Sequence, residues 1–174
     1  MPFKDFAALD RAAADAYLQA HVARADARLE AFRAEVAATG GPPVESLDGS
    51  PESLPGVWRW FVARRGGPAE LPPWYEPDPP GLEGERLSAS ALQDVDGIAL
   101  YLGLAFRRAL GPLEWGLGLE DPRKHYVSQH RPVLKAPGYD IDTLLVSYNL
   151  AMRTLEGRDT DDEALLRTLR AWTG

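Results

Sequence analysis

The side chains best suited to binding an anion lie in residues 97–137, which hold six basic residues against three acidic ones. The preceding segment, residues 66–96, has seven acidic residues and a single arginine. Arg107 and Arg108 end a helical pattern, and Arg131 follows on a predicted strand. If Arg107 and Arg131 converge, their guanidinium groups could bind a carboxylate, a phosphate or an acidic partner through paired hydrogen bonds. Two structural alternatives stay open: the two segments attract each other within the fold, or the arginines complement a helix dipole.

Two of the three histidines, His125 and His130, lie five residues apart in the same segment, and Asp140 and Asp142 follow them. Imidazoles and carboxylates together can hold a hydrolytic metal ion. An odd separation along a strand, however, places the two imidazoles on opposite faces. We therefore predict no metal site and treat both histidines as candidate binding residues.

No catalytic signature accompanies these residues. Ser128 is two residues from His130 and could touch it on one face of a strand, but no third group completes a triad. Nucleophile elbows, phosphate-binding loops and dinucleotide-binding glycine turns are absent, and the chain has no cysteine. Enzymatic activity is therefore not indicated, and no cofactor is expected.

A second candidate binding element is the proline-rich, acidic segment 68–86, which contains Trp74 and Tyr75. Its six prolines predict an extended loop. The two aromatic side chains either clamp this loop onto the body of the protein or form a platform or lid that binds a partner.

The composition predicts a single domain over residues 1–174, because this length suffices for one core and is short for two. The net charge of −7 argues against a nucleic-acid partner, which requires a dense cationic surface. There is no apolar run of membrane-spanning length and no apolar signal-peptide core in the first residues. We therefore expect a cytoplasmic protein without membrane contact.

The pattern of apolar residues, glycine and proline predicts a predominantly helical α+β fold with about five helices and one antiparallel β-hairpin, at about 113–135. Within the hairpin, Pro132 indicates an edge strand or a bulge. The predicted order is a long helix over 3–38, a helix from Ser50 to the glycines at 66–67, the loop 68–86, a helix-plus-hairpin module over 88–157, and a C-terminal helix over 160–173.

Three details of the helices carry further expectations. The first helix is long for this domain, so it could pack within the chain or pair with a second copy in a homodimer. Trp60 falls away from the apolar stripe of its helix and is expected to be partly exposed, and His21 is expected to be half exposed. Gly97, inside an apolar helix, could mark a kink.

From about Gly97 to Gly157 the chain contains, in order, YLG at 101–103, FRRALG at 106–111, EW at 114–115, a predicted strand ending near Pro132 and a run from Leu144 to Met152. This order of features resembles a group of small bacterial proteins, some of them similar to immunity proteins of toxin systems. The resemblance implies an α+β module and a protein-binding role, and it carries over no catalytic residue.

Our leading expectation is a non-enzymatic protein-interaction module, such as an inhibitor or immunity-like partner of another bacterial protein. Its contacts would come from the loop with Trp74 and Tyr75 and from the basic hairpin. The alternative is a small-ligand-binding protein or hydrolase that uses His125, His130 and the nearby arginines.

Overall fold

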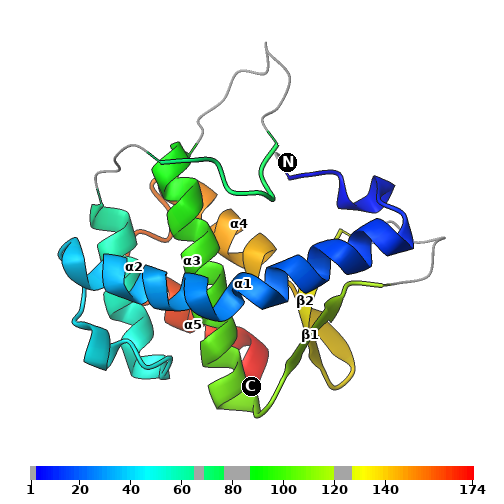
Figure 1. Cartoon of the computed structure of the whole chain (residues 1–174). Coiled ribbons are helices and arrows are strands. Elements are labelled where there is room, and N and C mark those ends of the chain that lie inside the picture. Colours follow the sequence, from blue (N-terminus) through cyan, green and yellow to red (C-terminus); the bar gives the residue numbers. More distant parts are fainter. Residues whose placement is uncertain (1–2, 65–68, 77–86, 120–126) are drawn as a thin grey trace.

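The computed structural model describes residues 3–64, 69–76, 87–119 and 127–174. Over these residues the chain forms five α-helices and a three-stranded antiparallel sheet, so the predicted helical α+β class is confirmed (Figure 1). The helices are α1 (Arg11–Ala38), α2 (Leu54–Ala63), α3 (Ala89–Leu110), α4 (Thr143–Leu155) and α5 (Ala164–Thr173). The strands are β1 (Glu114–Leu117), β2 (Pro132–Ala136) and β3 (Tyr139–Ile141).

Helix α1 begins at Arg11, eight residues later than the sequence predicted. Asp10 is the N-cap that sets this start, because its carboxylate accepts a hydrogen bond from the backbone N–H of Ala13 at 2.8 Å. The preceding residues Phe6–Ala8 form a separate 3₁₀ turn that buries Phe6. High alanine content favours a helix on both sides of this break, but only the cap fixes where it starts.

Helix α3 lies at the centre of the molecule, and α1 runs across it (Figure 1). Gly97 explains how the two helices come so close. A Cβ at this position would lie 2.1 Å from Cδ2 of Phe32, so a side chain cannot be accommodated without movement. Gly97 therefore marks a close helix crossing.

Both tryptophans of helix α2, Trp58 and Trp60, are buried against neighbouring elements. Trp58 donates to the backbone oxygen of Asp159 at 2.7 Å, and Trp60 donates to Oγ1 of Thr39 at 2.9 Å. The expectation that Trp60 is partly exposed is wrong, because it is 5 % exposed and packs edge-on against Phe32. The indole N–H finds a partner at the end of α1, which removes the cost of burying it.

The sheet has the order β1-β2-β3, with Glu114 opposite Lys135 and Leu134 opposite Ile141. The antiparallel β1–β2 pair was expected, and β3 was not. Pro132 predicts an edge strand or a bulge. The edge alternative is wrong, because β2 is the central strand of the described sheet. The bulge alternative agrees with the hydrogen bonds that join Gly118 to both His130 and Arg131, directly before Pro132. Proline is accommodated there because it is the first residue of the strand, at the end of the ladder.

Asp142 caps helix α4 by accepting a hydrogen bond from the N–H of Leu145 at 2.8 Å. Helix α5 starts at Ala164, four residues later than predicted. Both helices pack against α3, with the sheet on one side of α3 and α2 on the other (Figure 1). None of the helices in the described parts of the chain is long and apolar enough to cross a membrane.

Candidate functional site

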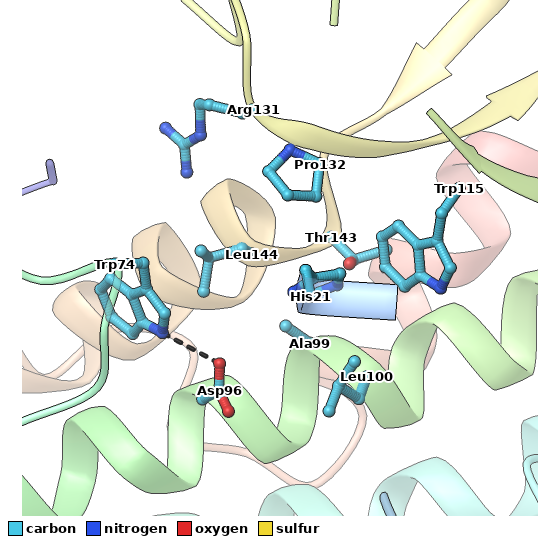
Figure 2. Close-up of a pocket in the computed structure, with 10 residues that line it drawn as sticks. All are labelled: His21, Trp74, Asp96, Ala99, Leu100, Trp115, Arg131, Pro132, Thr143 and Leu144. Carbon is cyan, nitrogen blue, oxygen red and sulfur yellow. Dashed lines mark hydrogen bonds between the residues drawn. The ribbon is translucent and has the colours of Figure 1, made fainter. Parts of the chain in front are cut away.

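A narrow cavity lies where α1, α3, α4 and the sheet meet, as Figure 2 shows. The space inside it that a water molecule can occupy is about 20 Å³, and the larger space of about 360 Å³ includes its open mouth. Every element around it contributes lining residues: His21 from α1, Trp74 from the segment before α3, Asp96, Ala99 and Leu100 from α3, Trp115 from β1, Arg131 and Pro132 at the start of β2, and Thr143 and Leu144 from α4.

Arg131 is a buried charged residue among those that line this cavity. It is 4 % exposed, and its Nε lies 3.0 Å from Oδ2 of Asp142. The two atoms are not aligned as a hydrogen bond, so Nε of Arg131 has no hydrogen-bond acceptor. Nη2 of Arg131 also has no acceptor. The guanidinium also lies over the ring of Phe3, 4.0 Å from its centroid. Burial lowers the pKa of Arg131 from its ordinary value, and the charge of Asp142 acts against this shift.

The backbone around Arg131 is fixed to the end of β1. The N–H of His130 donates to the oxygen of Gly118 at 2.8 Å, and the N–H of Gly118 donates to the oxygen of Arg131 at 2.9 Å. His130 has the positive φ of 60°, which turns the chain so that Arg131 enters the interior. The ring Nδ1 of His130 contacts the backbone oxygen of Phe6 at 3.2 Å. His130 therefore positions the neighbouring residue and does not line the cavity.

His21 faces the cavity from α1 and packs edge-on against Trp115, with ring centroids 4.8 Å apart. Its Nε2 is buried and has no hydrogen-bond partner. Burial lowers the pKa of His21, while Asp96 acts in the opposite direction, so the imidazole is neutral at pH 7. A neutral imidazole with a free Nε2 can donate to a ligand in one tautomer and accept in the other.

Asp96 is fully engaged by neighbouring side chains. Its Oδ1 accepts from Nε1 of Trp74 at 3.0 Å, drawn as a dashed line in Figure 2, and its Oδ2 accepts from Nη2 of Arg28 at 3.0 Å. Trp74 is 2 % exposed and packs against Phe3 and Tyr148. The acidic group of the cavity is thus already satisfied, whereas Arg131 and His21 are not.

A second hollow adjoins the first and shares His21, Asp96 and Leu100 with it. It has a volume of about 410 Å³ including its mouth, and Arg24 and Arg28 line it from α1. Two further cations therefore stand beside the opening of the cavity.

Of the predicted site residues, the structure brings Trp74 and Arg131 to one cavity. Tyr75 lies beside Trp74 and forms an isolated bridge with Phe3. Arg107 donates to the oxygen of Leu113 at 2.8 Å and lies over the ring of Trp115, so it supports the cavity wall from behind. Arg107 and Arg131 therefore have different partners, since Arg131 pairs with Asp142 and lies over Phe3, and the structure does not show the two arginines converging.

The remaining predicted residues lie elsewhere. Arg108 pairs with Asp48, with Nη1 2.7 Å from Oδ2, at the far end of α3. His130 contacts the N-terminal segment, as described above, and His125 lies outside the described residues. Among the described residues no group of three His, Cys, Asp or Glu side chains comes together to hold a metal ion.

The sequence analysis missed His21, Asp96 and Trp115 as cavity residues. His21 stands alone in an alanine-rich helix, and Asp96 sits in an otherwise apolar helix face, so both break a local pattern. Such breaks mark residues that need a specific partner in the fold. Comparison with protein-family models, with curated proteins and with solved structures found no match for this chain.

Proposed function

We propose that this protein binds the carboxylate of a compact organic anion in the cavity around Arg131, with the flat apolar body of the anion in the open mouth of the cavity. The observation that carries the proposal is the Nη2 of Arg131, which is buried, has no hydrogen-bond acceptor and belongs to a residue that lines the cavity. A buried donor without a partner costs free energy, about 1–3 kcal/mol, and an anionic ligand would recover it.

The charges around the cavity favour an anion over a cation. Both oxygens of Asp96 accept hydrogen bonds. Asp142 uses Oδ1 to cap α4, and its Oδ2, which has no hydrogen bond, lies 3.0 Å from Nε of Arg131 as an ion pair. The first residues of α4, Thr143 and Leu144, line the same cavity. The positive end of the helix dipole therefore adds to the charge of Arg131.

The walls favour a flat apolar body on this anion. Trp74 and Trp115 line the cavity from opposite sides, as Figure 2 shows, with Leu100 and Leu144 between them. Aromatic walls with a few polar groups are typical of small-molecule sites. The combination of two indoles and one guanidinium is suited to aromatic carboxylates.

Calorimetric titration with benzoate tests this proposal, with neutral benzamide as the matched probe. We expect saturable binding of benzoate, and binding at least tenfold weaker for benzamide. Trp115→Phe should weaken benzoate binding, whereas the control Trp172→Phe, in a half-exposed tryptophan of α5 outside the cavity lining, should leave it unchanged. Equal binding of both probes, or of neither, would contradict the anion site.

Partner binding, the role that the sequence favoured, stays a prediction. Trp74 lies in the core, so its replacement by alanine would remove packing and report on stability before partner affinity. Leu71, which is 49 % exposed in the same segment, is the better residue for this test. Capture of a second protein that fails only with Leu71→Ser would support the interaction role, and undiminished capture would remove this segment from it.

A further inference from the structure

A further cavity, separate from the two described above, lies between the end of α2, the start of α3 and the end of α4. It has a volume of about 700 Å³ including its mouth and shares no lining residue with the cavity around Arg131. Asp94 lines it together with four hydroxyl side chains, which are those of Ser88, Ser90, Thr154 and Thr160.

Asp94 is a buried carboxyl group with an unused acceptor. It is 2 % exposed, and its Oδ1 has no hydrogen-bond partner. Its Oδ2 lies 2.8 Å from Nε of Arg64, the residue that ends α2. A buried charged oxygen without a donor is unfavourable, so a site that contains one needs an explanation.

The positive charge of Arg64 does not fully compensate the negative charge of Asp94, because the same guanidinium also interacts with other groups. Its Nη2 lies 2.5 Å from Oε1 of Glu35, its Nη1 donates to Thr39 at 2.9 Å, and its guanidinium lies over the ring of Trp60. The other cation that acts on Asp94 is Arg28, which is paired with Asp96. One guanidinium thus faces two carboxylates, and the balance at this cavity is negative.

We propose that this cavity binds a small primary ammonium compound, whose N–H groups donate to Oδ1 of Asp94. The hydroxyl oxygens of the lining serine and threonine residues can accept the remaining ammonium hydrogens. Phe61, Val62 and Leu155 line the rest of the cavity and suit a short hydrocarbon chain. The ligand would supply Asp94 with a compensating positive charge and with a hydrogen-bond donor for Oδ1.

Binding of a cation here is coupled to a proton. Burial raises the pKa of Asp94 to about 7, with Glu35 acting in the same direction and Arg64 and Arg28 against it. An ammonium group favours the ionised carboxylate, so its binding displaces the proton of Asp94. Because the ionised fraction rises from about a tenth at pH 6 to about nine tenths at pH 8, affinity should rise about tenfold over this range.

Titration with n-butylammonium at pH 6 and pH 8 tests the site, with 1-pentanol as a neutral probe of similar size. We expect saturable binding about tenfold tighter at pH 8, with proton release detected in buffers of different ionisation enthalpy. Asp94→Asn should weaken binding at least tenfold, whereas the control Asp15→Asn, at a partly exposed position of α1, should not.

The wild-type protein gives a second readout that needs no variant. The side-chain carboxyl carbon of Asp94, followed by NMR, should titrate near neutral pH, and butylammonium should move this transition to lower pH. Pentanol binding as tightly as butylammonium, an affinity that does not change with pH, or an Asp94 titration that ignores the ligand would each overturn the ammonium site.

Discussion

Nε of Arg131 lies 3.0 Å from Oδ2 of Asp142, yet Nη2 of the same guanidinium has no acceptor. The ion pair holds the arginine in place through the residue that caps α4. In the proposed function, Nη2 is the donor that remains for a ligand in the cavity. Because both groups are buried, removal of either one leaves an uncompensated charge, which is strongly destabilising.

The first prediction concerns the crossing of α1 and α3. Gly97→Ala should destabilise the protein by about 1–3 kcal/mol, because the added Cβ meets the ring of Phe32 and overpacks the core. Gly103→Ala in the same helix is the matched control. Its Cβ would meet Leu134 and Trp115 at an ordinary 3.6 Å, so it should stabilise the protein by about 0.5–1 kcal/mol. Urea denaturation measures both, and equal effects would contradict the close crossing.

Tyr101 ties α3 to the loop before α2. Its hydroxyl donates to Oγ of Ser53 at 2.6 Å and accepts from the N–H of Gly49 at 3.1 Å. Tyr101→Phe leaves that buried N–H without an acceptor and should cost about 1–2 kcal/mol. Tyr139→Phe removes only an exposed bond to the backbone oxygen of Trp172 and should cost less than about 0.5 kcal/mol. Thermal unfolding of the two variants should rank them in this order.

The contribution of His21 to the free energy of unfolding depends on pH. Burial holds its pKa below 6.5, so the unfolded chain binds a proton more readily than the folded one. Stability from this group is therefore complete above about pH 6.5 and is lost as the pH falls below it. His21→Gln cannot titrate, so the wild type should lose more stability than this variant between pH 7 and pH 5. A difference between the two that stays constant with pH would show that His21 is not held neutral.

The contribution of Asp94 to stability changes with pH in the opposite direction. Burial raises its pKa from 3.8 to about 7, so between these values the folded protein binds more protons than the unfolded chain. Stability from this group is therefore complete below about pH 4 and falls as the pH rises towards 7. Asp94→Asn should remove this loss, so the variant should gain on the wild type as the pH rises. Denaturant midpoints at pH 4.5 and pH 7.5 measure the gain, and a gain that decreases with pH would contradict the assignment.

Much of the fold could be predicted from local patterns. Alanine content predicted α1, and the apolar run of α3 predicted its burial, because helix propensity and periodicity are properties of neighbouring residues. The start of α1 at Arg11 and the strand β3 escaped prediction. Asp10 is one of several acidic residues that could have capped the helix, and β3 is only three residues long, so its pairing depends on β2.

The candidate site was less predictable, because its parts come from six segments of the chain. The basic segment and Trp74 were identified from composition, but His21 and Trp115 join them only through tertiary packing. The sequence also suggested that Arg107 and Arg131 could converge, but Arg107 lies over the ring of Trp115 and Arg131 over the ring of Phe3. Charge patterns identify candidate arginines, and packing decides which of them lines a cavity.

The most direct test of the anion site is the NMR spectrum of the five indole N–H groups during a benzoate titration. We predict saturable shifts for Trp74 and Trp115, none for Trp172, and loss of the shifts in Arg131→Lys, which keeps the charge but changes the donor geometry. A folded wild-type protein in which Trp74 and Trp115 do not respond, or in which Trp172 responds as strongly, would contradict the account.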